Sequence, residues 1–130
     1  MIIEDARILV VDDDNVMRKF VVNLLTRLCI GEVQEAIDGQ TGLVLAGSFR
    51  PDLVLSDIHM HPIDGLEFVR RLRAHAIVEL RKVPVLMMSA DSSNQTLRES
   101  VPLGIAGYII KPPQILSLKV KIEHALKFRE

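Results

Sequence analysis

The amino-acid sequence predicts an α/β fold, a doubly wound, flavodoxin-like parallel sheet of five strands in the order 2-1-3-4-5 with five helices. Short apolar runs rich in β-branched residues alternate strictly with segments of helical periodicity. The first run, Arg7–Val11, is too uniformly apolar for an edge strand that faces water on one side, as is typical of a strand buried on both faces of a sheet. The chain has 130 residues, the size of one domain, and we expect residues 1–130 to form a single domain.

In the first half of the chain, the expected elements are joined by short turns. The first strand spans Arg7–Val11, and Asp14 or Asn15 caps a helix that runs to about Leu28. A weaker strand at 32–36, a short helix from Gly39 through Ala46 and a third strand at 52–56 follow. The helical spacing of apolar residues predicts that the first helix buries Val16, Met17, Phe20, Val21, Leu24 and Leu28.

The second half continues the alternation. A helix opens at Asp64–Gly65 and runs through about Ala74, and the fourth strand spans 84–88. A helix at 92–101 is expected to be marginal, because Ser, Asn and Thr are weak helix formers and Pro102 stops it. The fifth strand is 108–110 and the last helix spans 114–128. The expected inward residues of the third and last helices are Leu66, Phe68, Val69, Leu72, Ile115, Leu118, Ile122, Ala125 and Leu126.

Composition excludes several classes of protein. Lys plus Arg is 16 and Asp plus Glu is 17, so the formal charge of -1 argues against direct binding of nucleic acid. No apolar run approaches the roughly 20 residues of a membrane helix, and the first residues do not form a signal peptide. Cys29 is the single cysteine, which rules out an intramolecular disulfide and fits a reducing cytoplasm. We therefore expect a cytoplasmic protein that does not insert into membranes.

Polar side chains follow four of the five strands. In a doubly wound sheet, ligands bind outside the carboxyl ends of the strands, so these side chains are expected to meet at one site. Each of them alone has an ordinary explanation as a helix cap, a turn residue or a solvated lysine, but four consecutive coincidences favour a functional site. The residues are Asp12, Asp13 and Asp14 after the first strand, Asp57 after the third, Ser89 after the fourth and Lys111 after the fifth.

The chemistry of these groups suggests phosphoryl transfer. Asp12, Asp13 and Asp57 repel one another when close, and a divalent cation such as Mg²⁺ or a nearby ammonium relieves this repulsion. Lys111 can pair with Asp57 in the free site and with a phosphoryl oxygen in the filled one, and Ser89 can donate to a second oxygen. Asp57 is then the nucleophile that attacks phosphorus in line. Asp14 is expected to cap the helix instead.

Five segments of the sequence resemble the receiver domain of two-component response regulators, with the layout of its single-domain chemotaxis members. The resemblance covers essentially the whole chain. The segments are Ile8-Leu-Val-Val-Asp-Asp13, Leu53-Val-Leu-Ser-Asp-Ile-His-Met60, Ile63-Asp-Gly65, Pro84-Val-Leu-Met-Met-Ser-Ala90 and Gly107-Tyr-Ile-Ile-Lys-Pro112.

This resemblance implies transfer of a phosphoryl group to Asp57 from a sensor histidine kinase or a phosphotransfer protein. It implies Mg²⁺ bound by Asp13, Asp57 and the backbone carbonyl of His59, with Asp12 acting through a metal-bound water. It places Ser89 at the hydroxyl position and Tyr108 at the aromatic switch position of the family. Such a chain catalyses its own phosphorylation and dephosphorylation, but it is not a turnover enzyme.

The output surface implied by the resemblance is the face of the fourth helix, fifth strand and fifth helix. On the last helix, Leu116 and Val120 lie one turn apart outside the expected buried stripe. We expect this face to bind a downstream output protein or domain. Because the fourth helix is marginal, we expect residues 92–106 to be the most mobile part of the unphosphorylated domain.

Two other interpretations of the acidic residues are kept as alternatives. The spacing of Asp12 and Asp14 also fits the nucleophile motif of haloacid-dehalogenase-type phosphatases, but the only acids after Lys111 are Glu123 and Glu130. Steady turnover of a phosphomonoester would identify such a phosphatase. A receiver-shaped module that is never phosphorylated is the other alternative, and the intact acids, hydroxyl and lysine weigh against it.

Overall fold

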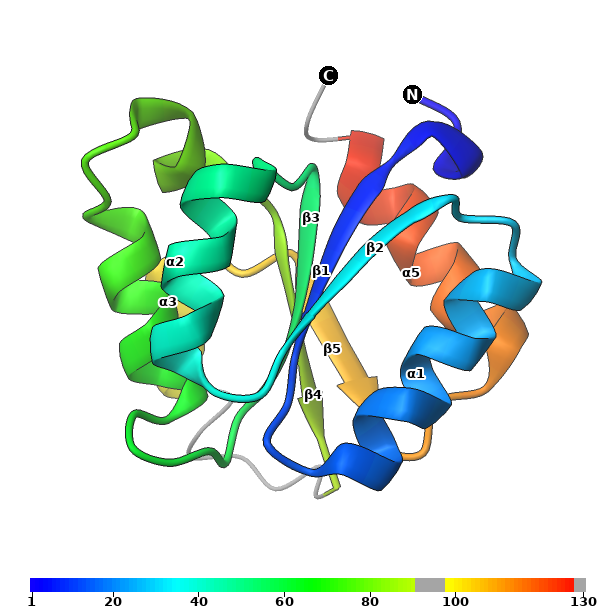
Figure 1. Cartoon of the computed structure of the whole chain (residues 1–130), viewed down its shortest axis with the longest axis horizontal. Helices are drawn as coiled ribbons and strands as arrows, with labels where there is room; N and C mark the ends of the chain where they lie inside the picture. Colours follow the sequence, from blue (N-terminus) through cyan, green and yellow to red (C-terminus); the bar gives the residue numbers. More distant parts are fainter. Residues whose placement is uncertain (91–97, 128–130) are drawn as a thin grey trace.

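The computed structural model, which describes residues 1–90 and 98–127, contains a sheet of five parallel strands in the order β2-β1-β3-β4-β5 (Figure 1). This is the order predicted from the sequence. Relative to the prediction, β3 and β4 each begin and end one residue later, so that Asp57 and Ser89 are the last residues of their strands. The strands are β1 (Arg7–Val11), β2 (Glu32–Ala36), β3 (Leu53–Asp57), β4 (Val85–Ser89) and β5 (Gly107–Ile110).

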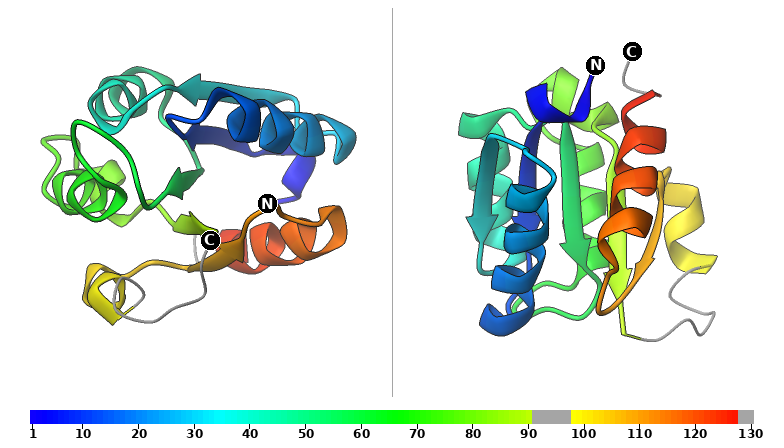
Figure 2. Two further views of the ribbon diagram at one scale, coloured as in Figure 1. Left: turned by 90° about the horizontal axis from the view of Figure 1, so that it is seen from below. Right: turned by 90° about the vertical axis from the view of Figure 1, so that its right-hand side faces the viewer.

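Helices cover both faces of the sheet. On one face lie α1 (Asn15–Arg27) and α5 (Ile115–Lys127), and on the other lie α2 (Gly39–Phe49) and α3 (Gly65–Arg73) (Figures 1 and 2). Most of the helix expected at 92–101 lies outside the described residues, although residues 98–100 are helical. Short 3-10 turns, which the sequence did not predict, are η1 (Ile3–Asp5), η2 (Val78–Lys82) and η3 (Val101–Leu103).

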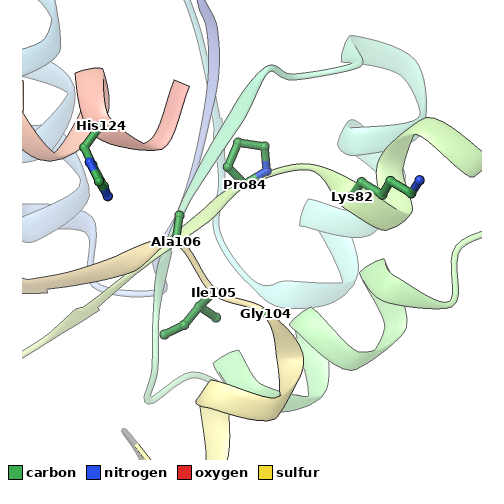
Figure 3. Close-up of a pocket in the computed structure, with 6 residues that line it drawn as sticks. All are labelled: Lys82, Pro84, Gly104, Ile105, Ala106 and His124. Atoms are coloured by element: carbon green, nitrogen blue, oxygen red, sulfur yellow. The ribbon is translucent and has the colours of Figure 1, made fainter. Parts of the chain in front are cut away.

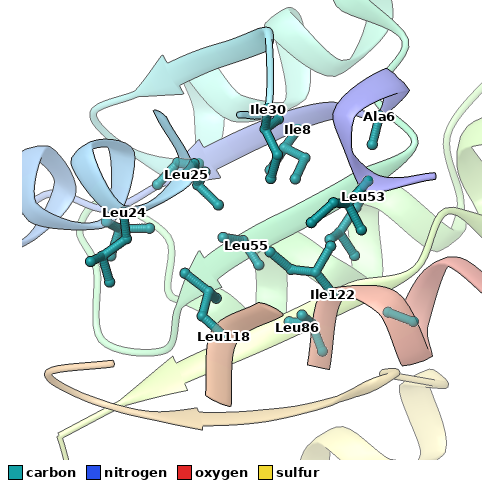
Figure 4. Packing of buried hydrophobic residues seen from close by; sticks show 14 of the residues in the cluster. Ala6, Ile8, Leu24, Leu25, Ile30, Leu53, Leu55, Leu86, Leu118 and Ile122 are labelled. Carbon is teal, nitrogen blue, oxygen red and sulfur yellow. The ribbon is translucent and has the colours of Figure 1, made fainter. Parts of the chain in front are cut away.

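The core consists of two apolar layers, one on each face of the sheet. Alternate residues of β1 point to opposite layers: Ile8 and Val10 pack toward α1 and α5, whereas Leu9 and Val11 pack toward α2 and α3. Figure 4 shows the first layer. Because both faces are covered, β3, β4 and all of β1 after Arg7 are buried, which explains their apolar runs. In the first layer, the helices contribute Val21, Leu24, Leu25, Leu118, Ile122, Ala125 and Leu126.

Three of the helices begin at the carboxyl edge of the sheet with an aspartate cap. Asp14, as expected, accepts the N–H groups of Val16 and Met17 at 2.9 and 3.1 Å. Asp38 and Asp64 cap α2 and α3 in the same way. Each cap contributes about 1 kcal/mol, so these aspartates have a structural role at the same edge as the candidate site.

The buried side of α1 differs from the prediction. Val16 and Phe20, predicted to be buried, are 81% and 43% exposed. Val21 and Leu24 are buried as predicted, and Met17 and Leu28 are partly buried against the core. The other buried residues of the helix are Arg18 and Leu25. The apolar spacing was misleading because the first inward position is taken by an arginine, whose guanidinium finds hydrogen-bond partners beneath the site.

The other helices follow the prediction closely. α3 buries Leu66, Phe68, Val69 and Leu72 as expected. α2 continues one turn beyond the predicted end at Ala46, because the buried ring of Phe49 packs under the guanidinium of Arg7. The inward face of α5 is confirmed, and Leu116 and Val120 are 73% and 63% exposed.

The first and last described residues, Met1 and Lys127, lie at the amino edge of the sheet, opposite the edge that carries Asp57 (Figure 2). α5 runs antiparallel to the strands and so returns the chain to the edge where β1 begins. Among the described residues, no helix has the length and apolar character needed to cross a membrane.

Candidate functional site

Three carboxylates meet at the carboxyl edge of the sheet. Asp12 and Asp13 follow β1, and Asp57 ends the neighbouring strand β3. One carboxylate oxygen of each lies within 4.8 Å of the others. Parallel pairing of β1 with β3 causes this meeting, because Val11 lies opposite Ser56 and the next residue of each strand is an aspartate. The sequence prediction that these acids converge is confirmed.

A nearly buried ammonium lies between two of these carboxylates. Lys111, the residue after β5, places Nζ 2.9 Å from Asp12 Oδ2 and 3.0 Å from Asp57 Oδ1. Its backbone N–H also donates to the carbonyl of Ser89 at 2.8 Å, which ties the lysine to the end of β4. The expected pair with Asp57 is present, and the pair with Asp12 is an addition to it.

The site carries more negative than positive charge. Burial raises the pKa of Asp57, the charge of Asp12 raises it further, and the hydrogen bond and charge of Lys111 offset this only in part. Burial alone would lower the pKa of Lys111, but its hydrogen bonds to Asp12 and Asp57 keep that pKa above its usual value. One ammonium therefore does not balance three carboxylates.

Asp12 and Asp13 are neighbours in sequence but differ in their surroundings. Asp12 is fully buried, and its Oδ1 accepts the N–H of Asp14 at 2.9 Å while its Oδ2 accepts from Lys111. Asp13 is exposed, and its Oδ2 lies 3.3 Å from the N–H of His61. Exposed and buried carboxylate oxygens in one cluster are ligands that suit Mg²⁺, which takes one or two carboxylates and keeps several waters. The donor set fits a divalent cation.

The backbone after Asp57 is held by the start of α3. The N–H of Ile58 donates to Asp57 Oδ1 at 2.9 Å, and the N–H of Gly65 donates to the carbonyl of Ile58 at 2.7 Å. A Cβ at residue 65 would lie 2.3 Å from the backbone oxygen of Asp57, so only glycine allows this approach. This steric constraint explains the glycine in the Ile63-Asp-Gly65 segment.

The remaining predicted residues lie around this cluster. Ser89 is buried at the end of β4, beside β3, and His59 is exposed two residues after Asp57. Tyr108 lies farther back on β5, opposite Met87, where it is half-buried and burial raises its pKa. The Tyr108 hydroxyl is hydrogen-bonded to the side chain of Ser100.

One residue of the site was missed by sequence reasoning. Arg18 of α1 is 6% exposed, and it donates through Nη1 to the backbone carbonyl of Asp12 at 2.8 Å. Its position three and seven residues before the buried Val21 and Leu25 is a signal that was available in the sequence.

A cavity of about 420 Å³ lies at the opposite, amino edge of the sheet (Figure 3). Its floor is apolar, and the side chain of Lys82 points away from that of His124. Because its charged groups do not converge, we do not consider it a functional site. It is lined by Lys82, Pro84, Gly104, Ile105, Ala106 and His124.

The fold and the carboxylate–lysine cluster together define a class, the flavodoxin-like α/β domains that carry an acidic cation site at the carboxyl edge of the sheet. Comparison with known families narrows this class. The response regulator receiver domain matches residues 8–123, and the chain belongs to this family. It is a receiver domain of the kind found in two-component signalling, and the phosphatase alternative is not favoured.

Individual relatives agree with this assignment. The chain is 36% identical to chemotaxis protein CheY-3 of Vibrio cholerae over 120 residues, which cover 92% of this chain and 91% of the relative. It is 36% identical to chemotaxis protein CheY of Pseudomonas aeruginosa over 117 residues, 90% of this chain and 93% of that one.

Solved structures show the same fold. Chemotaxis protein CheY4 of Vibrio cholerae, crystallised at low pH, superposes with a TM-score of 0.83 at 28% identity, over 93% of this chain and 98% of the other. A putative response regulator from Chloroflexus aurantiacus superposes with a TM-score of 0.86 at 25% identity, over 95% and 98% of the two chains. CheY-like receiver domains interact with histidine kinases and with output proteins.

Proposed function

We propose that Asp57 accepts a phosphoryl group from the phosphohistidine of a sensor histidine kinase or phosphotransfer protein, in a reaction that needs Mg²⁺. The observation that carries this proposal is the distribution of hydrogen bonds over the carboxylates. Both carboxylate oxygens of Asp12 accept hydrogen bonds. On Asp57, the N–H of Ile58 and the ammonium of Lys111 both contact Oδ1. Within the described part of the chain, Oδ2 of Asp57 is left to attack phosphorus.

Asp13, Asp57 and the backbone carbonyl of His59 would hold Mg²⁺, with Asp12 acting through a water. The ion would neutralise charge on the phosphoryl oxygens during transfer. The Asp57 oxygen forms a bond to phosphorus as the bond from phosphorus to the donor histidine nitrogen breaks, and that nitrogen leaves with the electron pair. Lys111 then pairs with one phosphoryl oxygen, and the Ser89 hydroxyl donates to another.

Asp57 can be identified as the acceptor by mass spectrometry of the intact protein incubated with acetyl phosphate and Mg²⁺. We expect a phosphoryl adduct on the parent protein and on Asp14→Asn, whose cap an asparagine preserves. We expect none on Asp57→Asn. Equal labelling of Asp57→Asn and Asp14→Asn would overturn the assignment. Loss of Mg²⁺ binding in Asp14→Asn but not in Asp13→Asn would overturn the proposed ligands.

We further propose that residues 1–130 act as one cytoplasmic domain that does not turn over a substrate. Its self-phosphorylation and its dephosphorylation both take place on the carboxylate of Asp57. Steady hydrolysis of a phosphomonoester such as p-nitrophenyl phosphate, persisting after many equivalents of product, would contradict this and favour a phosphatase.

The output face is proposed to comprise the fourth helix, β5 and α5, with Tyr108 as its switch. Support comes from the hydrogen bond between Tyr108 and Ser100, which links β5 to the end of the fourth helix, and from the exposed side chains of Ile110, Leu116 and Val120.

Amide hydrogen exchange with and without beryllofluoride and Mg²⁺ tests the proposed output face, with Asp57→Asn as control. We expect slower exchange at Tyr108 and residues 98–106. A change confined to residues 57–64 would contradict the proposal. The expected mobility of residues 92–106 falls partly outside the described residues.

A further inference from the structure

We propose that Arg18 is a positioning residue for the cation site, which it sets by holding the peptide between Asp12 and Asp13. This inference rests on the proposed function, because it concerns the same carboxylates. Arg18 touches no reacting atom, and its effect passes through the backbone of the two acids.

Each of the three nitrogens of the Arg18 guanidinium donates a hydrogen bond. Nη1 donates to the carbonyl of Asp12 at 2.8 Å, Nε to Glu35 Oε1 at 2.9 Å, and Nη2 to Asn15 Oδ1 at 2.7 Å. Glu35 is on β2, and its second oxygen pairs with the exposed Lys19 at 3.0 Å. The arginine therefore connects α1 and the edge strand β2 to the first residue after β1.

The carbonyl that Arg18 binds is part of the peptide unit that joins the two acids. On the other side of Asp12, its N–H donates to the carbonyl of Ala36 at 3.1 Å. The two peptide planes that flank Asp12 are thus each held by one hydrogen bond, and the bond from Arg18 restrains the plane that leads into Asp13. Asp13 needs this support more, because its carboxylate is exposed and has the long contact of 3.3 Å to His61.

Positioning and simple electrostatics predict opposite signs for one experiment. A positive guanidinium near the carboxylates repels an incoming cation, so removal of its charge should strengthen Mg²⁺ binding if only Coulomb forces act. If Arg18 aligns the ligands, its removal should weaken binding in spite of the lost repulsion. Groups that orient metal ligands from outside typically contribute about 10- to 100-fold in affinity.

The geometry also separates arginine from lysine. Three acceptors that lie around three separate nitrogens match the planar fork of a guanidinium, whereas the donors of an ammonium all diverge from one nitrogen and cannot reach all three. Arg18→Lys keeps the charge and loses the fork. It should therefore behave like Arg18→Met, which keeps the apolar stem and loses both.

The test is Mg²⁺ titration followed by amide chemical shifts of Asp13 and His61, since the chain has no tryptophan. We expect about tenfold weaker binding for Arg18→Met and for Arg18→Lys. Lys19→Met loses the other ion pair to Glu35 but does not touch Asp12, and should bind Mg²⁺ as the parent does. In the metal-free protein, the Asp14 amide should exchange faster in both Arg18 variants.

A second control separates positioning from loss of stability. Val21→Ala removes buried methyl groups one turn farther along α1 and should destabilise the fold without changing Mg²⁺ affinity. Unchanged or tighter binding in Arg18→Met, parent-like binding in Arg18→Lys, or equal weakening in Val21→Ala would each overturn the inference. A parent protein that binds no Mg²⁺ and accepts no phosphoryl group would instead overturn the proposed function itself.

Discussion

Two groups of charged and polar residues meet at Asp12, and they differ in how far their negative charge is compensated by positive charge. The acidic cluster comprises Asp12, Asp13, Asp57 and Lys111. The support cluster comprises Asn15, Arg18, Lys19 and Glu35, and its one carboxylate has two cationic partners. The carboxylate of Asp12 belongs to the first group, and its backbone carbonyl belongs to the second.

The pKa values of two acids express this difference. Burial raises the pKa of Asp57, and Lys111 does not compensate for it. Burial also acts to raise the pKa of Glu35, but Lys19 and Arg18 more than offset it and hold that pKa below its usual value. The comparison teaches that the domain leaves negative charge uncompensated in the acidic cluster, whereas in the support cluster the single carboxylate of Glu35 is paired with two cations.

The largest effect is expected from removal of the one ammonium in the acidic cluster. Lys111→Met leaves the buried carboxylates of Asp12 and Asp57 without their counter-ion, and we expect the free energy of unfolding to fall by about 3 kcal/mol in the absence of Mg²⁺. Urea denaturation measures it. Lys119→Met, an exposed lysine on α5, should change stability by less than about 0.5 kcal/mol. Equal losses in the two variants would show that the buried pairing does not stabilise the fold.

A smaller change in the free energy of unfolding, of opposite sign, is expected on substitution of Asp57. The raised pKa of Asp57 means that folding disfavours its ionised carboxylate. The free energy of unfolding therefore falls as the pH rises from 3.8 through the raised pKa. At neutral pH without Mg²⁺, Asp57→Asn should therefore have a higher free energy of unfolding than the parent protein, as measured by urea denaturation. Mg²⁺ should close this gap by stabilising the parent protein. The exposed cap variant Asp64→Asn is the control, and a destabilised Asp57→Asn would contradict the imbalance.

The smallest effect concerns the support cluster. Because the pKa of Glu35 is lowered, its ion pairs stabilise the fold above pH 4.5, and this contribution is lost as pH falls through the lowered pKa. Glu35→Gln should be less stable by about 0.5–1 kcal/mol at neutral pH, with the difference vanishing in acid. Thermal unfolding across this pH range measures it. Glu32→Gln, a more exposed glutamate on the same strand, serves as the matched control, and a pH-independent difference would refute the account.

Much of the fold could be predicted because the signals are local and repeated. Unbroken apolar strands, aspartate caps and the spacing between them define each element, so β1 and β2 have their predicted bounds and the others differ by at most a few residues. The full inward face of α1 could not be predicted in this way. Val16 and Phe20 have the right spacing for burial, and only the tertiary partners of Arg18 decide that this arginine faces inward while those two residues are exposed.

The site shows the same limit. Convergence of Asp12, Asp13, Asp57 and Lys111 follows from strand order alone, since each residue ends or follows a strand. The division of roles between Asp12 and Asp13 does not follow, because it depends on which carboxylate is buried and on hydrogen bonds from Asp14 and His61. Gly65 lies in the Ile63-Asp-Gly65 segment that resembles the family, but the need for a glycine there follows only from the approach of α3 to the carbonyl of Asp57.

The position of the described ends at the amino edge of the sheet has a practical consequence. A polypeptide or fluorescent reporter joined at Met1 or beyond Lys127 would leave from the edge opposite Asp57, a sheet-length away from the cation site and from the support cluster. Attachment there leaves the path of an incoming phosphoryl donor open. We therefore expect a reporter attached at either described end to leave the edge that carries Asp57 accessible.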